Sequence, residues 1–146
     1  MIVPALAGLG TPHWDPFARG LIVGLTRSTE KPHIARAALD SIALSVAEVL
    51  GCLESSSGHQ LPRLRVDGGA CVNDLLMQTQ ADVLGVPVDR PAVLETTALG
   101  AGLLSGLATD FYPSVMAVSE ARRIEKTFHP QMNESQRQQR LDQWRD

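Results

Sequence analysis

Two adjacent glycines flanked by polar side chains form the part of the sequence best suited to bind a ligand. Asp67, Gly68, Gly69 and Ala70 follow a short apolar run, and Asn73 stands where a helix is expected to begin. Glycine has no Cβ, so the chain can adopt a positive φ there and let a flat ring or a phosphate lie against the backbone. The amino terminus of the following helix adds unpaired N–H donors. The pattern therefore predicts a ligand-binding turn between a strand and a helix.

Each of these residues also has a purely structural interpretation. Gly68 and Gly69 can form a tight turn with no ligand, because a pair of glycines is a weak signal. Asn73 can cap the helix or hydrogen-bond a base or ribose, and its spacing favours the cap. Asp67 can stabilise the turn or reach a ribose. Gly68 and Ala70 would line the same turn through their backbone atoms.

The elements around the turn must hold it in place. Leu64 to Val66 is expected to form a short strand that ends at the turn, and a helix is expected from Val72 or Asn73 to Leu84, with Gly85 as its stop. Val86 to Val88 is the next expected strand.

Further elements are expected before and after this unit. Met1 to Ala5 is a short strand candidate, a loop is expected over Ala7 to Arg19, and Gly20 to Leu25 has the apolar composition of a buried strand. A long amphipathic helix is expected from Pro32 to near Glu54, followed by a polar break at Ser55 to Gly58. Its apolar stripe comprises Ile34, Ala38, Ile42, Val46, Val49 and Leu53.

A third helix is expected from Thr96 or Thr97 through Leu107. It contains three glycines, which are expected to pack closely against a sheet or a partner helix. The polar tail from Asn133 to Asp146 is expected to form a terminal helix anchored by Leu141 and Trp144. Because strands alternate with helices, the order of the elements predicts a parallel α/β arrangement.

The composition bounds the class of protein. The chain has 146 residues, 44% of them hydrophobic and 20% charged, which is typical of one globular domain. The net charge is -3 and the basic residues are scattered, which argues against nucleic acid as a partner. No apolar window approaches a membrane span and the first residues lack a signal-peptide pattern, so a cytoplasmic location is expected. Cys52 and Cys71 lack the spacing of a zinc site and are expected to be structural free thiols.

Several longer motifs resemble a known family. Gly20 to Leu25, followed after seven residues by His33 to Asp40, resembles the carboxy-terminal signature of the FGGY carbohydrate kinases. Further motifs are similar to the glycerol kinase branch of that family, and they occur in the same order. These motifs are Val3 to Gly10, Trp14 to Pro16, Arg65 to Ala70 and Glu95 to Ala101. The resemblance covers nearly everything from Ile2 to about Pro130.

The resemblance implies the actin-like, ribonuclease-H-like ATPase fold, with ATP bound between two domains. Residues 1–130 would form part of the carboxy-terminal domain, incomplete at its amino-terminal strands, and residues 131–146 a polar tail or helix. Gly69 and Asn73 carry over as positions that bind ATP or ADP, with Asp67, Gly68 and Ala70 beside them. Mg²⁺ is expected only through the nucleotide, since no protein ligand for it is identified.

The resemblance also implies a reaction, the transfer of phosphate from ATP to a polyol such as glycerol. The catalytic aspartate, the phosphate loop and the sugar-binding domain of that family have no counterpart in this sequence. No catalytic residue is therefore assigned, and the chain alone is expected to be inactive. An independent catalytic role is not expected for the carboxylates of Asp15, Asp40, Asp67, Asp74 and Asp82 or for His33.

Several alternatives stay open at this stage. His13 stands where glycerol kinases commonly carry an aromatic residue, and Thr11-Pro12-His13 is also similar to pentulose kinases, so the substrate is open. Polyol or sugar would bind only with the missing domain, and a complementing amino-terminal chain or a second copy are the expected partners. The alternative function is a noncatalytic nucleotide-binding or oligomerisation module, and a third possibility is a remnant with no binding function.

Overall fold

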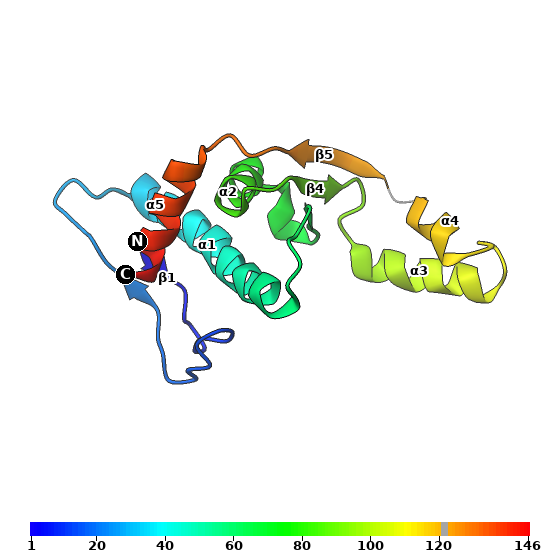
Figure 1. The fold of residues 1–146 in the computed structure, drawn as a ribbon, viewed down its shortest axis with the longest axis horizontal. Helices are drawn as coiled ribbons and strands as arrows, with labels where there is room; N and C mark the ends of the chain where they lie inside the picture. The colour runs from blue at the N-terminus through cyan, green and yellow to red at the C-terminus, as the bar shows by residue number, and fades with distance from the viewer. Residues whose placement is uncertain (121–122) are drawn as a thin grey trace.

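The structure is a computed structural model that describes residues 1–120 and 123–146. Figure 1 shows a body of helices and short strands, with both termini at one end and two helices extended at the other. In chain order the elements are β1 (Ile2–Val3), β2 (Leu21–Ile22), α1 (Lys31–Ser57), β3 (Leu64–Arg65), the 3₁₀ helix η1 (Gly69–Val72), α2 (Asp74–Leu84), β4 (Val88–Pro91), α3 (Thr96–Ala108), α4 (Val115–Glu120), β5 (Ile124–Phe128) and α5 (Glu134–Arg145).

The strands form two separate small sheets. β1 pairs with β2 in antiparallel fashion, whereas β3, β4 and β5 form a second sheet with β4 in its centre. β3 and β4 are parallel, as expected, but β5 is antiparallel to β4, so the expected parallel arrangement does not extend to the whole sheet. Sequence patterns did not predict β5, because its three central residues, Glu125, Lys126 and Thr127, are polar and it buries only Phe128. β4 also begins later than expected, at Val88.

Local signals fix the ends of the two central helices. α1 begins at a capping box formed by Glu30 and His33, with Pro32 in its first turn, and ends at Gly58, whose φ is 68°. The polar break expected at Ser55 is therefore wrong, because the serines before Gly58 continue the helix. α2 begins after Asn73 and ends at Gly85, whose φ is 70°, so both predicted ends are confirmed.

The core lies where α1 crosses α2 above the second sheet. Its buried members are Ala43, Leu44, Cys71, Leu76, Met77, Ala81, Val83, Val88 and Phe128. In α1 the buried face is that of Ser41, Ala43 and Leu44, whereas most of the expected apolar stripe is exposed, including Ile42. The prediction for this face is wrong because α2 packs on the side of Ala43.

β2 also differs from the prediction of a buried strand. Leu21 and Ile22 are 53% and 50% exposed. They pair with Val3 and Ile2 of β1, and this two-stranded sheet is not hydrogen-bonded to the other one. Burial of an apolar strand requires a sheet or helix on its faces. The segment before β2, expected to be a loop, is confirmed as turns and isolated bridges.

We call α3 and α4 together the α3–α4 arm, which extends away from α1 and α2 (Figure 1). α3 contains no buried residue, and it follows Glu95 as its N-cap residue instead of one of the threonines. A side chain added at Gly100 or Gly102 would meet no atom within 4 Å. The predicted close packing of the helix glycines is therefore wrong at these two positions, although Gly106 lies against the ring of Tyr112.

The polar tail forms the predicted helix. α5 begins at a capping box of Asn133 and Gln136, and Leu141 and Trp144 pack against the core. Within the part of the chain that the structure describes, no helix is both long and apolar enough to cross a membrane.

Candidate functional site

The glycine turn links the end of β3 to η1 and α2. Gly68 has φ 79° and ψ 174°, a conformation that only glycine adopts at low cost. Its N–H donates to the carbonyl of Leu94 at 3.2 Å, so the turn is tied to the segment that follows β4. η1 then begins at Gly69 and leads into α2 through Asn73. The sequence therefore places a glycine where the backbone requires one.

The surface of this turn is open. A Cβ built on Gly68 or Gly69 would meet no atom within 4 Å, and both Gly69 and Ala70 are exposed. A planar group can therefore approach the backbone here without displacing a side chain. The turn is therefore open to a ligand, and the binding of a nucleotide here stays a prediction.

The two polar residues of the turn both have structural partners. Asn73 Oδ1 accepts a hydrogen bond from the N–H of Leu76 at 3.1 Å, which is the helix cap that its spacing favoured. The hydroxyl of Thr96 donates to a carboxylate oxygen of Asp67, so Asp67 joins the turn to the first residue of α3. Contacts of Asn73 and Asp67 with a nucleotide stay predictions.

Arg90 of β4 hydrogen-bonds the backbone of η1, next to the turn. Sequence patterns did not identify this residue. Its side chain is 8% exposed, and Nη1 donates to the carbonyls of Cys71 at 3.0 Å and Val72 at 3.3 Å. The same nitrogen lies 2.7 Å from Asp74 Oδ1, and Nε lies 2.6 Å from Glu125 Oε2. The signal available in the sequence was a charged pair, Asp89-Arg90, directly after the expected strand Val86 to Val88.

The ion pairs around Arg90 shift the pKa values of Asp74 and Arg90 in favour of their charged forms. Hydrogen bonds from Lys126 and then from Arg90 hold the pKa of the Asp74 carboxyl below its ordinary value. Glu125 and Asp74 in turn raise the pKa of the Arg90 guanidinium. Lys126 Nζ also lies 4.6 Å from the centre of the Phe128 ring. The network therefore links η1, α2, β4 and β5 through its ion pairs.

The other residues considered for chemistry have structural roles. Asp15 accepts from two backbone amides of its own loop, Asp40 pairs with two arginines, and Asp82 accepts from the backbone amides that precede α5. His33 belongs to the capping box of α1, and His13 Nε2 lies 3.0 Å from Glu48 Oε1. The structure brings none of these five side chains to the glycine turn.

The two cysteines match the structural role predicted for them. Cys71 is buried, and its Sγ donates to the carbonyl of Gly68 at 2.9 Å. Burial raises the pKa of the Cys71 thiol, so it is neutral at physiological pH. Cys52 is half-buried in α1 and also free. Among the described residues, no group of three or more potential metal ligands is found.

A cavity of about 630 Å³ lies beside the turn, between the second sheet and the α3–α4 arm. Asp67 and Thr96 line it, and its walls are largely apolar. Its other lining residues are Arg65, Val66, Pro91, Ala92, Val93, Leu99, Gly100, Leu103, Tyr112, Val118, Ser119 and Arg123. The open turn thus borders a space of the size that small ligands occupy.

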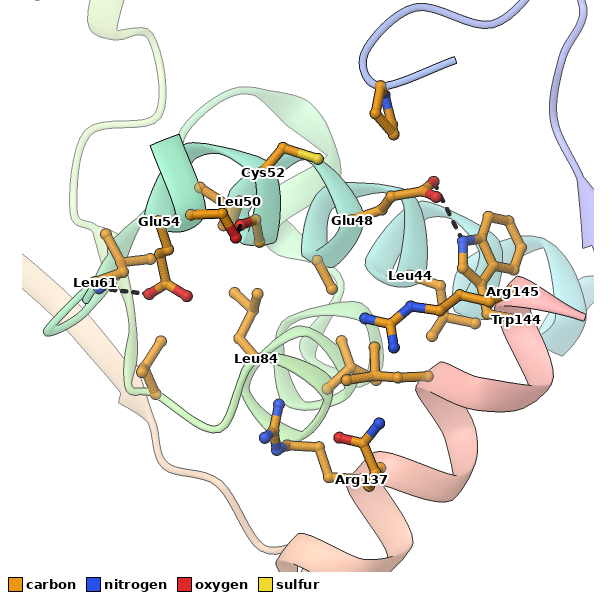
Figure 2. A pocket seen from close by; sticks show the side chains of 18 of the residues that line it. Leu44, Glu48, Leu50, Cys52, Glu54, Leu61, Leu84, Arg137, Trp144 and Arg145 are labelled. Carbon is orange, nitrogen blue, oxygen red and sulfur yellow. Dashed lines mark hydrogen bonds between the residues drawn. The ribbon is translucent and has the colours of Figure 1, made fainter. Parts of the chain in front are cut away.

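A second cavity, of about 720 Å³, lies between α1, the end of α2 and α5. Figure 2 shows Trp144 of α5 directed toward Glu48 of α1, and Glu54 directed toward the backbone of Leu61. None of the predicted site residues lines this cavity. We therefore place the candidate site at the glycine turn, where the backbone is open and a ligand has been predicted, and not at the larger cavity.

Comparison with known proteins gives one family. A model of the FGGY family of carbohydrate kinases, C-terminal domain, matches residues 1–109. The chain is 54% identical over 143 residues to a glycerol kinase of Nitratidesulfovibrio vulgaris (strain DP4), a match that covers 98% of the chain and 29% of that relative. It is 56% identical over 144 residues to a glycerol kinase of Bordetella parapertussis, covering 99% of the chain and 28% of the relative. The chain thus spans less than a third of the length of these relatives.

Solved structures agree with the sequence matches. The crystal structure of Plasmodium falciparum glycerol kinase with ADP is similar over 99% of the chain and 29% of its own, at 36% identity and a TM-score of 0.89. A gluconate kinase from Lactobacillus acidophilus has a TM-score of 0.82 over 99% of the chain and 29% of its own, at 24% identity, which is a likeness of fold alone.

Proposed function

The chain belongs to the FGGY family of carbohydrate kinases, and we propose that it forms the nucleotide-binding side of an ATP-dependent polyol kinase of the glycerol kinase type. The family and the solved structures confirm the predicted fold class, the α/β carboxy-terminal domain of an actin-like ATPase. Under this proposal, the complete kinase transfers phosphate from ATP to glycerol and releases glycerol 3-phosphate and ADP. The chain alone supplies nucleotide contacts and no catalytic base.

The observation that carries the proposal is the open backbone at Gly68 and Gly69. Gly68 has a positive φ directly after β3, and a Cβ at Gly68 or Gly69 would meet no atom within 4 Å. In parallel α/β units, ligands bind beyond the carboxyl ends of the strands, and β3 and β4 are parallel neighbours here. The relative solved with ADP has the same fold over this chain, which supports a nucleoside as the ligand.

The residues of the turn would contact different parts of the nucleotide. A base or ribose would lie against Gly69 and Ala70, and the exposed Asn73 would donate from its Nδ2 while Oδ1 continues to cap α2. Asp67 is fixed by Thr96 and would reach a ribose hydroxyl. Mg²⁺ would arrive with the phosphates of the nucleotide and neutralise their charge.

Titration of the chain with ADP, followed by NMR of the backbone amides, tests this proposal. We expect the largest shifts within Gly68 to Asn73, and the replacement Gly69→Leu should abolish them because the side chain would fill the open surface. Gly51→Leu is the matched control, since Gly51 also faces open space but lies in α1, away from the turn. Binding that survives Gly69→Leu, or no binding by the wild-type chain, would overturn the assignment of the turn.

Catalysis requires a separate experiment with a complementing chain. We expect that co-expression with the portion of a related glycerol kinase that precedes the matched segment produces ATP-dependent phosphorylation of glycerol, and that the chain alone produces none. If the two chains form a stable complex that phosphorylates no polyol or pentulose, the kinase proposal fails. Activity of the chain alone would also contradict it.

The exposed apolar surface supports a second candidate, a nucleotide-binding module that associates through this surface. Leu21, Ile22 and Val23 are exposed next to an α1 whose Ile34 and Ile42 are also exposed. Apolar surface of this kind on a soluble chain commonly marks an interface. The molecular mass in solution, measured with and without ADP, distinguishes the two functions. If the chain stays monomeric at every concentration, both with ADP and without it, the associating module is excluded.

A further inference from the structure

We propose that Arg90 is the positioning residue of the glycine turn, so that the guanidinium under η1 sets the backbone geometry on which the nucleotide lies. The inference rests on the proposed function of the turn and adds a residue that would not itself touch the nucleotide. It assigns a specific task to a charged side chain that is almost completely buried in a small domain.

The contacts of Arg90 are directed at the backbone of the turn. Nη1 donates to the carbonyls of Cys71 and Val72, the last two residues of η1, at 3.0 and 3.3 Å. These residues stand between Gly69 and Asn73, the two positions expected to contact the nucleotide. The carbonyls are thereby held toward β4, and the opposite face of the turn stays open.

The guanidinium is itself held from two sides. Asp74 Oδ1 lies 2.7 Å from Nη1, and Glu125 accepts from Nε at 2.6 Å and from Nη2 at 3.3 Å. The fork geometry of arginine allows these contacts at the same time, whereas the single ammonium group of lysine does not. The ring of Phe128 lies 5.3 Å from Cζ and limits movement on one face.

Arg63 provides a matched comparison within the same sheet. Its Nη1 lies 2.6 Å from Oδ2 of the buried Asp89, the residue that precedes Arg90 in β4. The Arg63 side chain is 45% exposed, and its Nη1 donates to Asp89 in place of the glycine turn. Both arginines therefore pair with carboxylates around β4, but only Arg90 binds carbonyls of η1.

Separate substitutions of Arg90 and Arg63 in the full chain test the proposal. We expect Arg90→Lys to raise amide hydrogen exchange at Gly69 to Asn73 by about tenfold relative to exchange in α1, the effect of losing one strong hydrogen bond. We expect ADP affinity to fall by about tenfold as well, because the backbone on which the nucleotide lies loses the same hydrogen bond. Arg63→Lys should change neither quantity. Arg90→Met, compared with Arg63→Met, provides a second pair in which the charge is removed altogether.

The outcomes separate this inference from the proposed function. Unchanged exchange in the turn of Arg90→Lys would overturn the inference, and so would a uniform rise throughout the chain, which would indicate a general loss of stability. If the wild-type chain binds no ADP, the proposed function fails, while exchange in the turn still decides whether Arg90 positions it. If Arg90→Met unfolds, Arg90→Lys decides the result.

Discussion

Trp144 donates a hydrogen bond from its indole Nε1 to Oε2 of Glu48 at 3.4 Å, which joins the last helix to the first (Figure 2). The replacement Trp144→Ala removes this bond and the packing of the indole on the core. Because Trp144 is only half-buried, we expect a loss of about 2 kcal/mol in the free energy of unfolding, below the range for fully buried aromatic residues. Urea unfolding measures this loss.

The exposed Trp14 is the matched control, and Trp14→Ala should change stability by less than about 0.5 kcal/mol. Equal losses in the two variants would contradict the docking of α5.

A second prediction concerns which face of α1 is buried. Leu44 belongs to the core, whereas Ile42 is 43% exposed. Leu44→Ala should therefore reduce the free energy of unfolding by about 3 kcal/mol, and Ile42→Ala by less than about 1 kcal/mol. Chemical denaturation of the two variants decides the matter. A larger loss at Ile42 would show that the apolar stripe of the sequence is the true core face in solution.

These helices also show what the sequence could predict. The ends of α2 follow from local signals, since Asn73 caps it and Gly85 adopts the left-handed conformation that stops it. The buried face of α1 does not follow from periodicity, because both Ile42 and Leu44 lie on apolar faces and only the position of α2 decides between them. Local patterns report an element, whereas burial depends on its neighbours.

The candidate site divides in the same way. The glycines and Asn73 were predictable, because a strand, a turn and a helix start are encoded within a short segment. The support by Arg90 was not, since its partners Cys71, Asp74 and Glu125 come from three other elements. A charged residue that is buried in a strand requires a partner, but the sequence does not identify that partner.

A third prediction tests the backbone of the turn. Gly68→Ala places a Cβ on a residue with φ 79°, so we expect a loss of about 1 to 2 kcal/mol in the free energy of unfolding. Gly69→Ala lies in η1 and meets no atom within 4 Å, so it should change stability by less than about 0.5 kcal/mol. Thermal or urea unfolding of both variants provides the comparison. Equal stability of the two would argue that Gly68 does not hold a positive φ in solution.

The final prediction concerns the acid dependence of the network around Arg90. The pKa of Asp74 lies below its ordinary value of 3.8, first because of the hydrogen bond from Lys126 and then because of the one from Arg90. A carboxyl whose pKa is lower in the folded state stabilises the fold above its unfolded pKa, and this stabilisation is lost as the pH falls through the folded value. We therefore expect the contribution of Asp74 to be present above about pH 4 and to be lost progressively as the pH falls from there through the lower folded pKa. Titration of the Asp74 carboxyl carbon by NMR should give a midpoint below 3.8 in the wild-type chain, and Lys126→Met should move it upward. A midpoint that does not respond to the loss of Lys126 would contradict the assigned cause.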